Sequence, residues 1–122
     1  MDDQQRKAAG LLGEELALAH LQANGLKLIA RNYRCKMGEI DLVMLDGGTL
    51  VLVEVRYRAS TDYGGAAASI DWRKQRRLAN AAEHLLMKRA ELKRYPARFD
   101  VIAITTAAAD ANIEWIKRAF TL

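Results

Sequence analysis

The chain has 122 residues, of which 51% are hydrophobic and 28% charged, so one compact domain over residues 1–122 is expected and disorder is disfavoured. No apolar run approaches the ~18 residues that cross a bilayer, and the polar start lacks the apolar stretch of a secretory signal, which predicts a cytoplasmic location without membrane contact. A single cysteine excludes an internal disulfide and a multi-thiolate zinc site, and the net charge of +4 favours an anionic partner.

One helix and then three strands are predicted for the first half of the chain. Apolar residues recur at helical spacing over residues 4–24, and a weak alternation predicts a strand over residues 26–33. The turn Asp46-Gly47-Gly48 separates two β-rich segments, residues 39–45 and 49–57, and predicts an antiparallel hairpin. Two apolar stripes of the helix are both expected to be buried: Leu11, Leu18 and Leu21 form one, and Leu12, Leu16 and Ala19 form the other.

A second helix and one or two further strands follow. Residues 70–89 have the pattern of an amphipathic helix, and residues 99–105 and 112–116 are strand candidates. A helix between the third and fourth strands is long enough for a right-handed crossover, so these two strands are expected to be parallel. The predicted fold class is therefore α/β, with a mixed sheet of four to five strands flanked by helices. The buried line of the second helix is expected to be Leu78, Ala81, Ala82, Leu85 and Leu86.

Two carboxylates of the hairpin are predicted to face each other. If the hairpin turns at Gly47-Gly48, opposed residue numbers sum to 95, which places Asp41 opposite Glu54 and Glu39 opposite Arg56. Like charges are costly to bury, so a bound cation is one solution, and Mg²⁺ fits best because it takes one or two carboxylates together with waters and phosphate oxygens. Structural ion pairs are the alternative: Glu39 with Arg56, and Asp41 or Glu54 with Arg58.

Three further residues are expected near these carboxylates. Glu14 falls within the stripe of Leu11 and Leu18, so it projects from the face that packs inward and is a candidate metal ligand. An ordinary acid at the rim of a buried face is the alternative. Lys74 and Gln75 extend the apolar line of the second helix by one turn and could reach the same site, although a solvated lysine is the commoner arrangement.

Three motifs carry these residues: Gly13-Glu14, Gly38-Glu39-Ile40-Asp41-Leu42 and Val53-Glu54-Val55-Arg56-Tyr57-Arg58. Together with Arg31-Asn32-Tyr33 and Arg98-Phe99-Asp100-Val101, they resemble the bacterial YraN family of nuclease-like proteins over nearly the whole chain. The resemblance implies a restriction-endonuclease-like fold and similarity to archaeal Holliday-junction resolvases, which share an acid followed by acid-x-Lys on the next strand. It implies that Asp41 is the first acid and Glu54 the second, that Glu14 matches the acid of the N-terminal helix, and that Lys74 matches a basic position of the second helix.

The chain departs from the family pattern at one catalytic position. The family usually has Val-Glu-Val-Lys-x-Arg, whereas this chain has Arg56 in place of the lysine. Arginine stays protonated at physiological pH because its pKa exceeds ~12, so it cannot act as a general base, but it can hold a phosphate or stabilise developing negative charge. If the site is active, the resemblance implies metal-assisted phosphodiester hydrolysis, with Asp41 and Glu54 as metal ligands and Arg56 as an electrostatic clamp.

The basic charge is concentrated in the middle of the chain. Residues 56–98 carry 11 basic and 4 acidic side chains, a net charge of +7, whereas residues 1–55 and 99–122 have net charges of −2 and −1. A phosphate-binding surface is one interpretation, and a solvated basic face is the other. The loops at residues 34–38 and 58–68 are expected to border the carboxylates. The candidate DNA contacts are Arg34, Lys36, Arg73, Lys74, Arg76 and Arg77.

The sequence thus predicts a metal-dependent endonuclease-like protein that binds structured or branched DNA and hydrolyses phosphodiester bonds with Mg²⁺ or Mn²⁺. A catalytically inactive nuclease-fold module for DNA binding or protein interaction is the alternative, which Arg56 favours, and a purely structural domain is a third. The resemblance to resolvases, which cut two strands symmetrically, also implies a homodimer. The expected catalytic residues are Asp41, Glu54 and Arg56, supported by Glu39, Arg58, Lys74 and Gln75.

Overall fold

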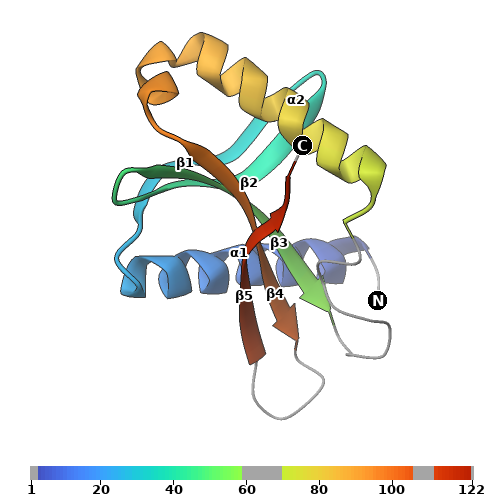
Figure 1. Cartoon of the computed structure of the whole chain (residues 1–122). Helices are drawn as coiled ribbons and strands as arrows, with labels where there is room; N and C mark the ends of the chain where they lie inside the picture. The colour runs from blue at the N-terminus through green and yellow to red at the C-terminus, as the bar shows by residue number, and fades with distance from the viewer. Residues whose placement is uncertain (1–2, 59–69, 106–111, 122) are drawn as a thin grey trace.

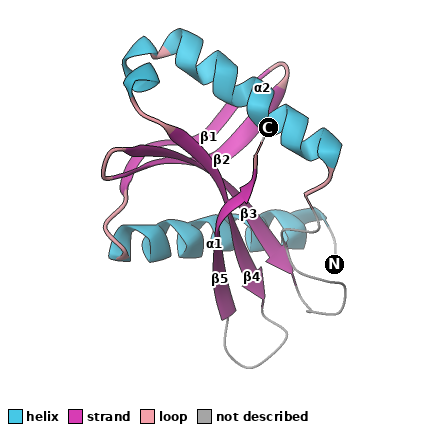
Figure 2. Ribbon diagram, in the orientation of Figure 1, coloured by secondary structure: helices cyan, strands magenta, loops and turns pink. Residues whose placement is uncertain are grey.

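The computed structural model of the protein describes residues 3–58, 70–105 and 112–121, without the side chains of residues 5–9 and 58. Two α-helices, a short 3-10 helix and five strands make up this described part of the chain (Figures 1 and 2). Neither α-helix is both long and apolar enough to cross a membrane. In chain order the elements are α1 (Asp3–Ala23), β1 (Lys27–Cys35), β2 (Gly38–Asp46), β3 (Thr49–Arg58), α2 (Trp72–Lys88), η2 (Ala90–Arg94), β4 (Ala97–Thr105) and β5 (Asn112–Phe120).

The five strands form one mixed sheet whose spatial order is the order of the chain. β3 pairs with β4 in parallel, and each of the other neighbouring pairs is antiparallel. A parallel pair needs a long crossover, and α2 lies within the connection from β3 to β4. The predicted α/β class, the element order and the parallel pair are therefore confirmed.

One helix covers each face of the twisted sheet, so the molecule has three layers (Figure 1). Successive side chains of a strand point to opposite faces, and the sheet therefore contributes to two separate hydrophobic cores. The core beneath α1 includes Leu21 and Val53, and the core beneath α2 includes Leu52 and Leu78. Because β3 is buried on both faces, a charged residue on it needs local partners.

Only one side of α1 is buried, which corrects the prediction of two. Leu11 and Leu12 are 61% and 53% exposed, whereas Ala17, Leu18 and Leu21 are buried. A helix that packs on a single sheet buries one stripe, and within the described residues no second layer covers the far side of α1. For α2 the prediction is confirmed at Leu78, Ala81, Ala82 and Leu85, which are buried, and Leu86 is partly buried against the same core.

The β2–β3 hairpin has the predicted register along its paired residues. Asp46 opposes Thr49, and the pairing continues to Leu42 opposite Val53. Beyond that pair the ladder ends and the alternation of faces breaks, since Leu42 contributes to the core beneath α1 whereas Ile40 contributes to the core beneath α2. Asp41 lies at this break, between the two cores.

α2 approaches the start of β2 very closely at Gly38. A Cβ atom on Gly38 would lie 2.1 Å from the carbonyl oxygen of Arg77 and 2.8 Å from its carbonyl carbon. Both contacts are with helix backbone, which cannot move aside as a flexible side chain would. Glycine at this position therefore allows the helix that carries Lys74 to lie against the strand that carries Asp41.

Asp100 joins β4, β5 and the hairpin turn through a buried hydrogen-bond network. It is 1% exposed, and its carboxylate accepts hydrogen bonds from the side chains of Arg98 and Trp115 and from the backbone N–H of Arg118. Arg98 also donates to Asp46, next to the hairpin turn, at 2.9 Å. Because a buried carboxylate is stable only when its oxygens are paired, this network fixes the relative positions of the three segments.

Candidate functional site

Asp41 and Glu54 come together where β2 and β3 part. The predicted direct opposition of the two residues lies one pair beyond the last paired residues, Leu42 and Val53. Instead, Asp41 Oδ2 accepts a hydrogen bond of 2.8 Å from the backbone N–H of Val55. The carboxylate therefore occupies the place that a backbone carbonyl has in a continuing ladder, and this bond holds it against β3 beside Glu54.

Glu54 is buried against two basic side chains. Its side chain is 5% exposed, and its Oε1 atom lies 3.2 Å from Lys74 Nζ on α2 and 3.9 Å from Arg56 Nε on β3. Lys74 thus reaches the carboxylates, as its place on the apolar line of the helix predicts. The contact brings the basic helix and the acidic pair together across the α2–sheet interface.

Burial raises the pKa of both carboxyl groups. For Asp41, burial and the neighbouring charge of Glu54 raise the pKa from 3.8 to about 7, although the Val55 N–H opposes the shift. For Glu54, burial raises the pKa, while Lys74 and Arg56 partly offset it. The two carboxylates repel each other, so a cation between them would stabilise their charged forms.

Glu14 on α1 supplies a third acid near the pair. Its charge contributes to the raised pKa of Asp41, which places the two carboxylates within electrostatic range. The Oε2 atoms of Glu14 and Glu54 are buried and have no hydrogen-bond partner among the described residues. Such atoms are costly to bury and are common where a ligand or ion completes the site.

The carboxylates fit a hard divalent cation that keeps most of its water. Within the described residues, no three His, Cys, Asp or Glu side chains converge closely enough to enclose a metal ion. An all-protein cage is therefore not formed by these residues. Mg²⁺ does not need one, because it is commonly bound by one or two carboxylates with waters and phosphate oxygens. Asp41 and Glu54 suit that role, with Glu14 as a third acid within electrostatic range of Asp41.

A basic pocket lies beside Glu54. The pocket has a volume of about 300 Å³, and its lining includes Arg56 from β3, Lys74 from α2 and Asp71, which precedes the helix. Two more arginines of the first turns of α2, Arg73 and Arg77, complete it. Four cations against one carboxylate give the pocket a net positive charge, which suits a phosphate group.

A second pocket lies on the α1 side of the carboxylates. Glu14 lines it together with Arg34 of β1, and its volume is about 340 Å³. Arg34 is well exposed, so its guanidinium is available to solvent or to an anionic ligand. Basic side chains therefore flank the acidic group on both sides, since Arg34 lies beyond Glu14 and Lys74 lies against Glu54.

Several predicted residues take other positions. Glu39 forms an ion pair with Arg34, its cross-strand neighbour on β1, at 3.4 Å. The side-chain amide of Gln75 donates to the carbonyl of Ile70 at 3.0 Å, so it links the first turn of α2 to the residue that precedes the N-cap. Lys36 and Arg76 are exposed, and Arg76 lies over the ring of Trp72. The Arg58 side chain and most of the predicted 58–68 loop lie outside the described residues.

Asp71 is a site residue that the sequence reasoning missed. It is the N-cap of α2, and its Oδ1 atom accepts a hydrogen bond of 2.9 Å from the backbone N–H of Lys74. The cap fixes the first turn of the helix and so positions the residue that contacts Glu54. An aspartate directly before a helical pattern is a recognised start signal, and it could have indicated this role.

Comparison with known proteins gives a consistent family. The sequence profile described as "Uncharacterised protein family UPF0102" matches residues 13–104, a range that contains Glu14, Asp41, Glu54 and Lys74. A UPF0102 protein of Stutzerimonas stutzeri is 48% identical over 114 residues, which cover 93% of this chain and 95% of that protein. One from Pseudomonas putida is 53% identical over 113 residues, with 92% and 91% covered.

A third relative covers almost the entire chain. The UPF0102 protein of Pseudomonas entomophila is 49% identical over 121 residues, which is 98% of this chain and 98% of that protein. The similarity therefore extends beyond the matched profile to both helices and all five strands. The chain belongs to the UPF0102 family, the YraN family that its motifs indicate.

Proposed function

We propose that this protein binds DNA through its phosphates and hydrolyses phosphodiester bonds at the Asp41–Glu54 pair with a divalent cation. The observation that carries the proposal is the contact of a buried acidic pair with a basic pocket, made by Lys74 and Glu54 at 3.2 Å. Acids that hold a cation next to a phosphate-binding pocket are the minimum that this chemistry requires. The buried carboxyls with raised pKa values support a functional site, because strongly perturbed carboxyls with specific charge partners cluster at functional sites.

Asp41 and Glu54 would hold the cation, with Glu14 as a third acid within electrostatic range. When bound, Mg²⁺ or Mn²⁺ supplies a water of lowered pKa and polarises the phosphate oxygens. The chain keeps both carboxylates in place without the cation, through the Val55 N–H and the Lys74 ammonium. The unpaired Oε2 atoms of Glu14 and Glu54 leave acceptor capacity for bound water.

Lys74 and Arg56 would stabilise charge on the substrate. Both lie beside Glu54 and both line the basic pocket, so a phosphate in the pocket would lie next to the acidic pair. Arg56 stays protonated and acts there as a clamp. Among the described residues, Lys74 is the second basic side chain that contacts the acidic pair. The similarity to resolvases supports a branched DNA substrate and a homodimer as the acting form.

A catalytically inactive DNA-binding module is the second candidate function. It is favoured by Arg56, which replaces the lysine that the YraN family usually has two residues after the second acid. In this case the basic pocket would hold DNA without turnover. The two candidates share the phosphate contacts and differ in the cleavage step alone.

A cleavage assay tests the proposal. Purified protein is incubated with four-way, flapped and linear duplex DNA, in Mg²⁺, in Mn²⁺ and in chelator. The variants are Asp41→Asn, Glu54→Gln, Glu14→Gln and Arg56→Lys. Glu15→Gln is the matched control for Glu14→Gln, because Glu15 is the neighbouring acid on α1 and its side chain is 60% exposed. Sedimentation with and without the four-way junction gives the oligomeric state.

The expected result is metal-dependent cutting that falls at least about 100-fold in Asp41→Asn and Glu54→Gln and is unchanged in Glu15→Gln. Binding without cutting, with cutting gained by Arg56→Lys, identifies the inactive module. If no DNA binds even at low salt, both candidate functions are wrong, and the carboxylates are structural.

A further inference from the structure

Trp72 is an exposed aromatic side chain at the start of α2. It is 70% exposed, although burying an indole ring is among the larger gains that a folding chain can make. Among the described residues, the other exposed large hydrophobic side chains are leucines and methionines, so Trp72 is the aromatic member of this set. The ring belongs to neither hydrophobic core, and its face is therefore available to a ligand.

Trp72 lies next to the basic pocket on the helix. Its neighbours in the chain, Asp71 and Arg73, both line that pocket, together with Lys74 and Arg77. Successive residues of an α-helix are turned by about 100°, so Trp72 lies on the surface strip adjacent to that of Arg73 and Arg77. A base on the indole ring and a phosphate in the pocket would thus contact neighbouring strips of the same part of α2.

Arg76 adds a positive charge beside the ring. It is four residues after Trp72, on the same side of the helix, and its guanidinium carbon lies 6.0 Å from the centre of the ring. Arg73, Arg76 and Arg77 are all exposed, so an aromatic face and several cations occur together at this end of α2. This combination is typical of surfaces that bind unpaired nucleic acid, where bases stack on aromatic rings and cations follow the phosphates.

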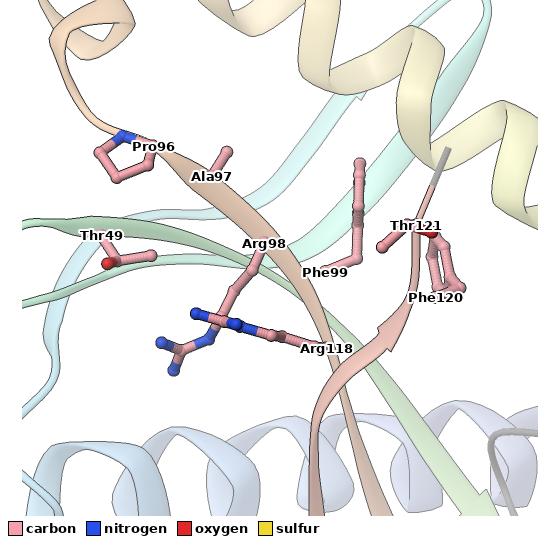
Figure 3. A pocket seen from close by; sticks show the side chains of 8 residues that line it. All are labelled: Thr49, Pro96, Ala97, Arg98, Phe99, Arg118, Phe120 and Thr121. Atoms are coloured by element: carbon pink, nitrogen blue, oxygen red, sulfur yellow. The ribbon is translucent and has the colours of Figure 1, made fainter.

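The pocket at the other end of β3 lacks this combination (Figure 3). It has a volume of about 450 Å³, and its two basic side chains are Arg98 and Arg118. The carboxylates of Asp46 and Asp100 lie beside them and both accept hydrogen bonds from Arg98. The charge of that pocket is therefore largely balanced, whereas the basic pocket next to Trp72 keeps a net positive charge.

We propose that Trp72 stacks on an unpaired base of the DNA strand whose neighbouring phosphates are held in the basic pocket. The inference rests on the proposed binding of DNA phosphates and adds a preference for strands with unpaired nucleotides. Within a continuous duplex each base is covered by its neighbours, so an indole ring can stack on a base only where that base is unpaired or terminal. Flapped and gapped DNA expose such bases and are the substrate class that this surface fits.

Fluorescence anisotropy in chelator tests the proposal, so that binding is measured without cleavage. The probes are single strands of about 12 nucleotides, abasic strands of the same length, and blunt duplexes, because the abasic strand keeps the phosphates and lacks the bases. Trp72→Leu removes the ring, and Trp72→Phe keeps a smaller one. Met87→Ala is the matched control, because Met87 is 76% exposed near the other end of α2 and none of these substitutions alters the net charge.

Wild type is expected to bind the normal single strand at least about fivefold more tightly than the abasic strand. Trp72→Leu should lose this difference, Trp72→Phe should keep part of it, and Met87→Ala should keep all of it. The affinity for the blunt duplex should be the same in all four proteins. The chain has two tryptophans, and quenching of their fluorescence by the normal strand should disappear in Trp72→Leu although Trp115 remains.

Three outcomes would contradict the proposal, and they separate it from the proposed function. Equal binding of normal and abasic strands by wild type, or a Trp72→Leu protein that still distinguishes them, overturns the stacking and leaves the phosphate contacts in place. An equal loss of affinity for single strand and duplex in Trp72→Leu also overturns it, because the ring would then not recognise an unpaired base. If wild type binds none of the probes at low salt, the proposed function is wrong as well.

Discussion

Asp41 is a carboxyl residue whose protonation is expected to change near neutral pH. Its pKa is about 7 in the folded chain, against 3.8 for the free side chain, because burial and Glu54 disfavour its charge. The folded state thus binds this proton more tightly than the unfolded state. The contribution of Asp41 to stability is therefore fully present below about pH 4 and is lost as the pH rises through about 7.

Asp41→Asn should remove this pH dependence. An amide oxygen can still accept the Val55 N–H, so the variant keeps the bond and loses the buried charge. Its free energy of unfolding is expected to exceed that of wild type by about 1–3 kcal/mol near pH 8 and to match it near pH 4. Urea unfolding across this range, without divalent cations, measures the difference, and Glu15→Gln should follow the wild-type curve. A difference that stays constant with pH would contradict the assigned shift.

Asp100 is the residue most important for the positions of β4 and β5. Its carboxylate is 1% exposed and accepts bonds from Arg98, Trp115 and the Arg118 backbone. Asp100→Asn should lower the free energy of unfolding by about 2–4 kcal/mol, because it leaves the largely buried Arg98 side chain without its fully buried charge partner. Asp46→Asn is the control, since Asp46 gives Arg98 a single, more exposed contact, and its loss should cost under about 1 kcal/mol. Equal losses in the free energy of unfolding of the two variants would show that the burial of Asp100 does not determine its contribution to stability.

At the scale of elements, the position of α2 depends on Gly38. The helix carries Lys74 and two arginines of the basic pocket, so its distance from β2 determines whether the pocket meets the acidic pair. Gly38→Ala would place a methyl group 2.1 Å from the Arg77 carbonyl oxygen, and helix or strand must then shift. We expect a loss of about 1–3 kcal/mol in the free energy of unfolding.

Gly48→Ala is the matched control for this prediction. Gly48 also lies in β2–β3 hairpin sequence, but a Cβ atom there has no neighbour within 4 Å and its φ angle is not in the left-handed region. The free energy of unfolding of the Gly48→Ala variant should stay close to that of wild type. Urea midpoints of the two variants test the comparison, and a Gly38→Ala protein as stable as Gly48→Ala would refute the close helix–strand contact.

The sequence predicts those elements that local rules determine. Counting from the Gly47-Gly48 turn gives the hairpin register, and helical spacing gives the buried line of α2. The end of the ladder after Leu42 and Val53 could not be predicted, because counting from the turn sets the register and does not tell how far the pairing continues. The exposure of Leu11 is similar, since helical spacing does not tell how much of a helix the sheet covers.

The same limit applies to the candidate site. Asp41, Glu54 and Lys74 were predictable as neighbours from strand pairing and helix periodicity. The ion pair of Glu39 with Arg34 was not predictable, because β2 has a neighbouring strand on each side and the pairing of β1 with β2 is known only from the assembled sheet. Asp100 has one local partner, Arg98, two residues earlier, but its other partners come from 15 and 18 residues further along the chain and could not be predicted from local sequence.

At the scale of the whole molecule, the modest net charge of +4 hides an uneven distribution that should determine DNA affinity. Four cations are gathered in the pocket beside Glu54, whereas Lys88 and Lys93 lie exposed at the far end of α2 and on η2. Under the proposed function, phosphates are bound at the pocket. Each pocket cation removed should therefore lower the salt dependence of binding, because one fewer counterion is released from the DNA.

Two double variants with the same charge change separate local from total charge. Arg73→Gln with Arg77→Gln removes two pocket cations, and Lys88→Gln with Lys93→Gln removes two distant ones. For duplex DNA, the slope of log Kobs against log salt should become shallower by about 1.8 in the pocket variant and stay near the wild-type value in the other. Fluorescence anisotropy at several salt concentrations gives both slopes. Equal changes would mean that affinity follows the net charge of the molecule, and the pocket would then have no special role in binding DNA.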